Sequence, residues 1–268
     1  MMQLEGYLKR IGYSGDLKPD LATLNAVHRG HLLSISYENL DIHRDCPLTV
    51  DLQQIYDKIV NRRRGGWCFE MNGLLAWALR EIGFDVTLLS SFVGRSEALE
   101  AGPGDHLILL VKLEKDYLAD VGFGNGFLEP LPLEEGIIQR NFFTYGLRQR
   151  DGRWWFQNQA YGGPGFDFDL QPYQLEEFAE QSTRLQTSPE SGFVKNTVCL
   201  RFIPEGLISL RGVVFRTITD QGPHDELIET ETHYAGVLQE QFDLVIPNIT
   251  PLWEKVQARH ITWLREQQ

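Results

Sequence analysis

The chain has a shortage of positive charge. Its 268 residues include 25 Lys and Arg against 37 Asp and Glu, which gives a formal net charge of −12. A protein this acidic has no general electrostatic attraction to nucleic acid or to an anionic membrane surface, so neither is expected as a partner. The net charge still allows a local basic pocket for one phosphorylated ligand.

Long hydrophobic runs are also missing. The longest uninterrupted apolar run, residues 74–79, has six residues, whereas a membrane-spanning helix needs roughly 20. The first residues have neither the basic nor the apolar segment of a signal peptide, so we expect a cytoplasmic protein. With 42% hydrophobic and 23% charged residues, the composition is typical of a folded globular chain.

Cysteine is scarce as well: the three are Cys46, Cys68 and Cys199. An odd, widely spaced set does not form a disulfide framework and fits a reducing compartment. His43 and Cys46 have the short spacing of metal ligands, but no second pair completes a tetrahedral set, so no metal is expected. Cys46 and Cys199 are interpreted as small apolar side chains.

The pattern of apolar residues changes along the chain. Helices are expected first, strands and hairpins follow, and helices return at the end. The expected helices are residues 21–32, 51–60, 68–82, 174–186, 232–242 and 251–265. The expected strands are residues 86–93, 106–113, 117–121, 142–150, 153–159, 197–203 and 207–214, with a loop at 161–172.

This segregation of helices and strands favours an α+β fold over a doubly wound parallel sheet. Asp20 is an expected N-cap, Thr49 or Asp51 is a candidate cap for the next helix, and Gly83 is an expected C-cap. Boundaries near residues 84 and 190 divide the chain into three parts.

Cys68 differs from the other cysteines because a helix is expected to begin there. Gly65 and Gly66 interrupt the preceding helix and allow a sharp turn. Unpaired backbone N–H groups and the helix dipole favour a thiolate at such a position, and the arginines at 62–64 add positive charge. The alternative is that the arginines end a solvated helix and that Cys68 is inert core.

A cysteine nucleophile needs a base, and the base needs a third group that holds its tautomer. His106 opens one expected strand and Asp120 ends the next, across a turn at residues 114–116. An ideal hairpin register does not pair them, so we expect them to be close only if the register is irregular or a bulge intervenes. Together with Cys68 they form a Cys, His, Asp order along the chain.

Four segments resemble the arylamine N-acetyltransferase family. Residues 64–70, RGGWCFE, are similar to its RGGxCxE segment, and residues 120–124 to its DVGFG segment. Residues 37–40, YENL, look like its FEN-type segment with Tyr for Phe, and residues 105–107 are similar to its histidine segment. The resemblance covers essentially the whole chain and is strongest before residue 130.

The resemblance implies transfer of acetyl from acetyl-CoA, as co-substrate, to arylamines or arylhydrazines through an acetyl-cysteine, in a ping-pong reaction. O-acetylation of N-hydroxyarylamines is an implied extension. The family's triad carries over onto Cys68, His106 and Asp120, with no metal. The implied fold has three parts and a cysteine-protease-like catalytic core. The parts are a helical bundle with the nucleophile (1–83), an antiparallel β-barrel with His, Asp and a linking helix (84–190), and an α/β lid (191–268).

Candidates for substrate contacts lie near these segments. Phe92, Val93 and Phe123 offer apolar surface to an aromatic amine, although aromatic side chains on strands usually belong to the core. Gly124 and Gly126 lie in a glycine-rich loop after a strand, whose backbone is a candidate nest for a CoA phosphate. Loop flexibility explains these glycines about as well.

Glu38 and Asn39 have the residue types of an acid–base pair, but we expect a structural role for them. A charge-assisted contact between Glu38 and Arg64 would fix the turn before Cys68. The expectation rests on the position of these polar residues in the family-like segments.

Two other functions stay open. A papain- or transglutaminase-like hydrolase or amide-exchange enzyme shares the Cys, His, Asp order, and a catalytically silent binding protein would keep the fold. Acetylation of Cys68 by acetyl-CoA separates the acetyltransferase from the hydrolase. Selective alkylation of Cys68 separates both from the silent protein.

Overall fold

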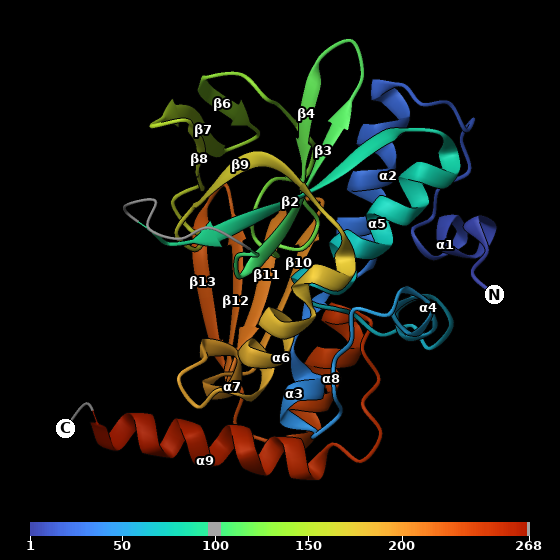
Figure 1. Ribbon diagram of the computed structural model, residues 1–268. Helices are drawn as coiled ribbons and strands as arrows, with labels where there is room; N and C mark the ends of the chain where they lie inside the picture. Colours follow the sequence, from blue (N-terminus) through green and yellow to red (C-terminus); the bar gives the residue numbers. More distant parts are fainter. Residues whose placement is uncertain (96–102, 267–268) are drawn as a thin grey trace.

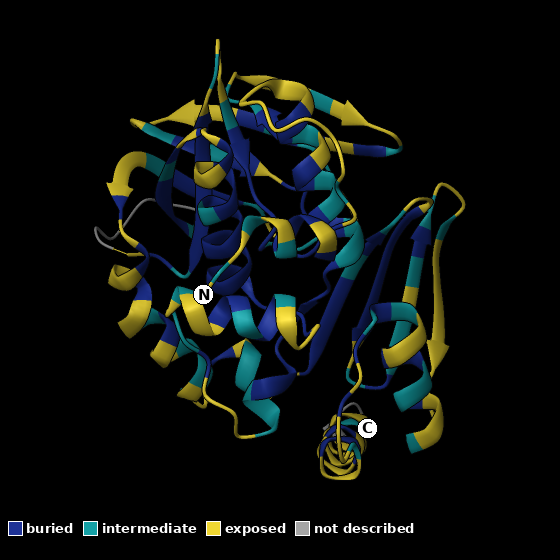
Figure 2. Ribbon diagram, turned by 90° about the vertical axis from the view of Figure 1, so that its right-hand side faces the viewer, coloured by how far each residue is buried: buried dark blue, intermediate teal, exposed yellow. Residues whose placement is uncertain are grey.

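Helices and two antiparallel sheets make up the computed structural model, which describes residues 1–95 and 103–266. The first helices pack beside the larger sheet, and the smaller sheet lies with α8 (Glu231–Phe242) and α9 (Thr250–Glu266) at the other end of the molecule (Figure 1). The predicted α+β fold, with helices first, an antiparallel barrel next and an α/β part last, is confirmed. Buried residues gather at the centre, whereas α9 is largely exposed (Figure 2).

The expected helix ends form where capping residues occur. Asp20 Oδ1 accepts from Thr23 N, and Asp51 Oδ1 accepts from Gln54 N, both at 2.8 Å. Gly83 has a φ of 107° and ends α5, since glycine tolerates the left-handed conformation. The helix expected at 51–60 is divided into α4 and a π-helical turn. No described helix has the length and apolar character needed to cross a membrane. The helical segments are α1 (Leu4–Arg10), α2 (Leu21–Ser34), α3 (Leu40–His43), α4 (Leu52–Tyr56), the π-helical turn (Asp57–Asn61), α5 (Cys68–Ile82), the 3-10 turn (Leu175–Phe178), α6 (Ala179–Thr187), α7 (Gly192–Lys195), α8 (Glu231–Phe242) and α9 (Thr250–Glu266).

The larger sheet has eight antiparallel strands in the order β5-β4-β3-β2-β9-β8-β7-β6. Its strands are β2 (Asp85–Val93), β3 (His106–Lys112), β4 (Asp116–Ala119), β5 (Leu131–Pro132), β6 (Gly136–Arg140), β7 (Phe143–Arg150), β8 (Arg153–Gln157) and β9 (Phe166–Tyr173). All residues of β3 except its last are buried, which explains the continuous apolar run in its sequence. Helix α5 lies against β2 and β3 (Figure 1).

The smaller sheet joins distant parts of the chain. Its strands are β1 (Tyr37–Glu38), β10 (Val198–Ile203), β11 (Gly206–Arg211), β12 (Val214–Thr219) and β13 (Gly222–Leu227), in the order β1-β10-β11-β12-β13. Tyr37 pairs with Leu200 in β10 and also forms a bridge with Gly66. The C-terminal sheet is therefore tied to the turn that precedes Cys68.

The prediction of a loop at 161–172 is wrong for its second half, because β9 runs through that part of the chain. Two aspartates and Pro172 lower the β-propensity of this segment. The strand is held by long-range contacts: it pairs with β2 and β8, and Asp167 lies 2.8 Å from Arg95 and 2.6 Å from Arg153. Local sequence does not reveal such partners.

The sequence analysis also did not predict two strands at the edges of the sheets. Strands β6 and β13 are mostly exposed, so they lack the alternating apolar face that identifies a half-buried strand. The single strand expected at 207–214 is divided between β11 and β12, because Gly212 turns the chain with a φ of 55°. Each error concerns a segment in which an apolar pattern is weak or interrupted.

Candidate active site

Cys68 is the first residue of α5 and follows a tight turn. A Cβ atom at Gly65 would lie 2.2 Å from Ser36 O, so only glycine fits there. Gly66 N donates to Ser36 O at 3.2 Å, and Glu38 N donates to Gly66 O at 2.9 Å. These contacts hold the turn against β1 and set the direction in which the cysteine side chain leaves the backbone.

A buried network of charged side chains supports this turn. Arg64 Nη2 donates to Glu38 Oε1 at 2.6 Å and lies 2.9 Å from Asp41 Oδ1. Lys58 Nζ lies 3.2 Å from Asp41 Oδ2 and 2.8 Å from Glu70 Oε2. The expected contact between Arg64 and Glu38 is confirmed, and it belongs to a set of two cations and three carboxylates that keep each other paired.

The arginines before the turn do not act on the sulfur as the sequence suggested. Arg62 pairs with Asp57 at 3.0 Å, and Arg63 pairs with Asp243 at 2.7 Å. The third arginine belongs to the buried network. Each of the three arginines therefore has a carboxylate beside it. The positive field that they were expected to exert on the cysteine is largely cancelled.

His106 and Asp120 meet in the structure. His106 Nε2 lies 2.8 Å from Asp120 Oδ2, and the two side chains are 3% and 1% exposed. In the ladder of β3 and β4 the last pair at this end is Leu109 with Ala119, so Asp120 lies just beyond it and is free to reach the start of β3. Because Nε2 bonds the carboxylate, Nδ1 is the nitrogen left to exchange a proton.

Asn72 is a residue of the candidate site that the sequence analysis missed. It is fully buried, one helical turn after Cys68. Its Nδ2 donates to Asp120 Oδ1 at 2.8 Å and to Leu107 O at 2.6 Å, and its Oδ1 accepts from Val121 N at 2.9 Å. Asn72 thus joins the helix of the cysteine to the elements that carry the histidine and aspartate. The available signal was an amide within the apolar stripe of α5.

His28, a fully buried residue of α2, is a second residue that the sequence analysis did not single out. Asp120 N donates to His28 Nε2 at 3.1 Å, and His28 Nδ1 lies 3.0 Å from Leu128 O. One ring nitrogen accepts and the other donates, so this arrangement requires a neutral imidazole. Burial lowers the pKa of His28 from its ordinary 6.5 to about 4. His28 therefore fixes the backbone of Asp120.

The sulfur of Cys68 is shielded from solvent. The residue is 2% exposed, and Sγ lies 4.0 Å from Asp105 O. Burial raises the pKa of the Cys68 thiol well above its ordinary value, and the carboxylates of Asp105 and Asp120 raise it further. The N–H groups of Phe69 and Leu107 act in the opposite direction. An anionic sulfur in this place therefore needs a positive partner, such as an imidazolium.

A cavity of about 480 Å³ gives access to the site. Cys68 and His106 both line it, as do Val93 and Phe123, two of the three predicted substrate contacts. The Phe123 ring lies 5.1 Å from the His106 ring, measured between centroids. The volume and the apolar lining suit a small aromatic ligand.

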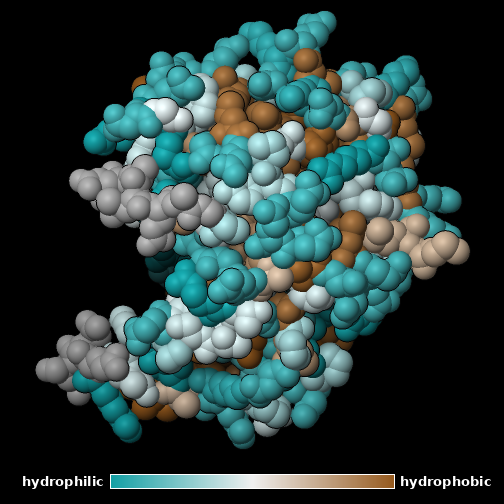
Figure 3. Space-filling view, viewed as in Figure 1, coloured by the Kyte–Doolittle hydropathy of each residue, from teal (hydrophilic) through white to brown (hydrophobic). Residues whose placement is uncertain are grey.

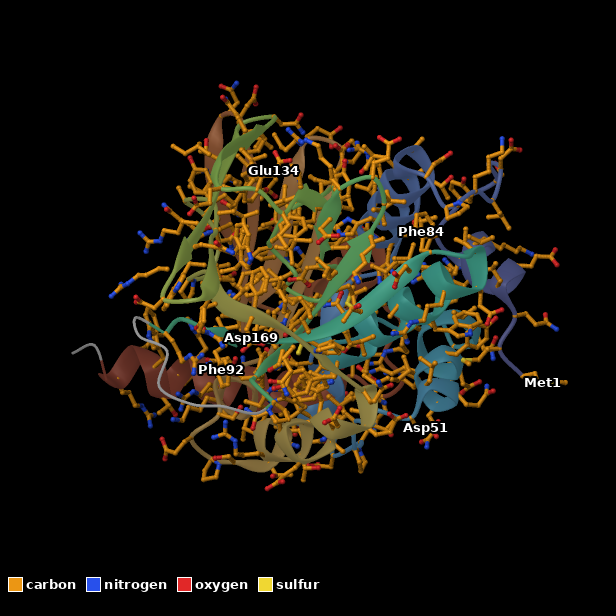
Figure 4. All side chains as sticks on the ribbon, turned by 45° about the horizontal axis from the view of Figure 1, so that its top comes forward. Met1, Asp51, Phe84, Phe92, Glu134 and Asp169 are labelled. Atoms are coloured by element: carbon orange, nitrogen blue, oxygen red, sulfur yellow. The ribbon has the colours of Figure 1, made fainter. Side chains whose placement is uncertain are left out.

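The other predicted contacts do not line this cavity among the described residues. Phe92 lies near the end of β2 (Figure 4), and its ring centroid is 3.4 Å from Arg95 Cζ. Gly124 has a φ of 78°, and a Cβ atom there would lie 2.5 Å from Leu200 Cδ1. Packing and backbone conformation are sufficient to explain Gly124. Gly126 packs beside Phe123 instead of opening onto the cavity.

Within residues 1–95 and 103–266, no group of three or more His, Cys, Asp and Glu side chains is arranged to hold a metal ion. His43 Nε2 lies 2.9 Å from Phe193 O, and Cys46 is exposed. The spacing noted between these two residues is not accompanied by further ligands among the described side chains.

A family model described as N-acetyltransferase matches residues 20–250 of the chain. The chain is 35% identical over 237 residues to an arylamine N-acetyltransferase of Gallus gallus, the pineal gland isozyme NAT-3, covering 79% of this chain and 81% of that protein. It is 32% identical over 277 residues to arylamine N-acetyltransferase 1 of Homo sapiens, covering 92% and 93%.

Solved structures show the same similarity. The arylamine N-acetyltransferase from Salmonella typhimurium has a TM-score of 0.87 with 27% identity, covering 96% of this chain and 100% of that one. The Mycobacterium marinum arylamine N-acetyltransferase in complex with CoA has a TM-score of 0.84 with 28% identity, covering 96% and 98%. The likeness therefore extends over the helices and both sheets.

Replacing Asn72 with Ala should slow alkylation of Cys68 by iodoacetamide at neutral pH. The substitution removes one of the donors that hold Asp120 and leaves Leu107 O and Val121 N without their partner. We expect a stability loss of about 1–3 kcal/mol together with a slower reaction of the thiol, measured by denaturant unfolding and by the alkylation rate.

Asn39 supplies the matched control for Asn72. It is equally buried and also makes three side-chain hydrogen bonds, to Phe193 O, Asn196 O and Val198 N, but none to the triad. Asn39→Ala should destabilise the fold without changing the alkylation rate of the folded protein. Equal slowing in both variants would show that Asn72 acts only through stability.

The neutral state of His28 predicts a loss of stability in mild acid. The folded-state pKa of about 4 lies below the unfolded value of 6.5, so between these pH values the unfolded chain binds a proton that the folded chain does not. The free energy of unfolding should fall as the pH drops from 6.5 to about 4. In denaturant titrations, His28→Gln should show a shallower fall of the free energy of unfolding. Part of the fall should remain, because burial also lowers the pKa of His31. An unchanged slope would refute the assignment.

Proposed function

The chain belongs to the arylamine N-acetyltransferase family, and on that premise we propose that it transfers acetyl from acetyl-CoA to an aromatic amine or hydrazine through acetyl-Cys68. The observation that carries the proposal is the hydrogen bond between His106 Nε2 and Asp120 Oδ2 beside a cavity that Cys68 also lines. A thiol, a base and an orienting carboxylate are the groups that thiol acyl transfer requires. CoA as donor is supported by the related Mycobacterium marinum structure in complex with CoA.

In the first half-reaction, His106 Nδ1 takes the proton of the Cys68 thiol, and Asp120 stabilises the imidazolium that results. Sγ then attacks the carbonyl carbon of acetyl-CoA, the bond from that carbon to the CoA sulfur breaks, and the CoA thiolate takes the proton from His106. Burial opposes a lone thiolate, so the charged sulfur is stable only beside the imidazolium. The N–H groups of Phe69 and Leu107 give it further support.

In the second half-reaction, the nitrogen of the acceptor attacks the acetyl carbon of acetyl-Cys68. The bond from that carbon to Sγ breaks, His106 takes the proton of the amine, and the proton returns to the sulfur. Free CoA leaves before the acceptor reacts, which makes the kinetics ping-pong. Cys68 and His106 are each only 2% exposed, and this shielding favours the amine over water as acceptor.

The acceptor's ring would lie between Val93 and Phe123, which supply apolar surface at the cavity. An aromatic amine is weakly basic, so its nitrogen is uncharged and nucleophilic near neutral pH. The same acetyl-cysteine would serve the oxygen of an N-hydroxyarylamine, which makes O-acetylation an extension of the proposal rather than a separate reaction.

Incubation with acetyl-CoA in the absence of an acceptor should place one acetyl group on Cys68, detected by mass spectrometry of the intact chain and its peptides. An aromatic amine added afterwards should remove the group and appear as the acetylated amine. Cys46→Ala should acetylate normally, because Cys46 is exposed and is not among the residues that line the cavity, whereas Cys68→Ala should not acetylate. A chain that stays unmodified while cleaving peptide amides would favour a hydrolase.

A further inference from the structure

A second cavity lies between α9 and the turn that joins β11 to β12. Its volume is about 580 Å³, and its walls come from residues 194–197 and 211–214, from residues 255, 256, 259, 260 and 263 of α9, and from His43 in α3. We call it the α9 cavity. The C-terminal end of α9 projects past the sheet (Figure 1), and the space-filling surface is hollowed above it (Figure 3). Arg211 lines both the α9 cavity and the catalytic cavity.

The lining of the α9 cavity has the opposite charge to the chain as a whole. The protein has a formal net charge of −12, yet no Asp or Glu is among the residues that line this cavity. Its basic members are His43, Lys195, Arg211, Lys255, Arg259 and His260. A lining with basic side chains and no carboxylate favours the binding of an anion.

Two of these cations are free to bind a ligand. Lys195 pairs with Glu190 at 3.0 Å and Lys255 with Asp45 at 3.1 Å, both through carboxylates outside the lining. Among the described residues, no carboxylate forms an ion pair with the guanidinium of either Arg211 or Arg259. A guanidinium presents a planar set of donors that matches the oxygens of a phosphate.

An aromatic wall adjoins the cations. Trp263 is 50% exposed, and its ring stacks on His260 with centroids 5.9 Å apart and an interplanar angle of 18°. Val213, Val214 and Val256 add apolar surface. A half-exposed indole on such a wall offers a stacking surface for a planar base, and stacking on aromatic side chains stabilises bound nucleobases.

We propose that the α9 cavity binds a phosphorylated nucleotide, with Arg211 and Arg259 on the phosphate groups and Trp263 against the base. Two sources supply this chemistry. One is the nucleotide end of the acyl donor, since Arg211 also lines the catalytic cavity; this source rests on the proposed acetyl transfer. The other is a free nucleotide that binds independently of turnover.

Calorimetric titration of the full chain with ADP tests the site itself. Arg259→Gln should weaken ADP binding about tenfold or more, because a charge-assisted contact is removed. Arg265→Gln is the matched control, since Arg265 lies exposed on the same helix outside the cavity lining and carries the same charge. Absence of ADP binding, or an equal loss in both variants, would overturn the proposal. The titration needs no turnover, so its result tests the α9 cavity even if the proposed acetyl transfer is disproved.

Steady-state kinetics then distinguish the two sources. S-acetylpantetheine carries the thioester but lacks the nucleotide. If the donor's nucleotide end occupies the α9 cavity, Arg259→Gln raises the KM for acetyl-CoA about tenfold and leaves the KM for S-acetylpantetheine unchanged. Weakened ADP binding with both KM values unchanged assigns the cavity to a free nucleotide. Equal increases for both donors would contradict nucleotide recognition at Arg259.

Discussion

The site depends on the hydrogen bond between His106 Nε2 and Asp120 Oδ2, which is 2.8 Å long. Both side chains are almost completely buried. Burial and the nearby carboxylates of Asp105 and Asp120 raise the pKa of the Cys68 thiol and disfavour its anion. Only an imidazolium beside the sulfur reverses that preference, and a buried imidazolium requires an anion at its other nitrogen. In the proposed mechanism, the Asp120 carboxylate therefore acts on Cys68 through His106 and does not touch the substrate.

Much of the fold serves to hold that carboxylate and the cysteine in place. Asn72 and Gly122 N donate to one oxygen of Asp120, and His28 accepts from its backbone N–H. On the other side, the buried ion pairs and the bridge from Tyr37 to Gly66 fix the turn at the start of α5. Helices, barrel and C-terminal sheet each contribute to the walls of one cavity, so the three parts of the chain work as one unit.

Sequence patterns predicted the elements whose signals are local. Helix α5 begins at Cys68 and ends before Gly83, as expected. The motif segments indicated Cys68 and His106, which line one cavity, and Asp120, which is hydrogen-bonded to His106. What the sequence could not predict depends on contacts between distant residues. Strand β9 depends on Arg95 and Arg153, Asn72 acts on elements reached only through folding, and Phe92 lies under a guanidinium instead of in the cavity.

The pH dependence of cysteine alkylation measures the central claim most directly. Iodoacetamide reacts with thiolates, and an unperturbed thiol is mostly protonated at a pH of about 6.5. The account predicts that buried Cys68 is labelled faster than exposed Cys46 at that pH, and that Asp120→Asn abolishes this preference while Cys46 keeps its rate. Labelling of Cys68 no faster than Cys46, or a preference that survives Asp120→Asn, would contradict the dependence of the sulfur anion on the His106–Asp120 pair.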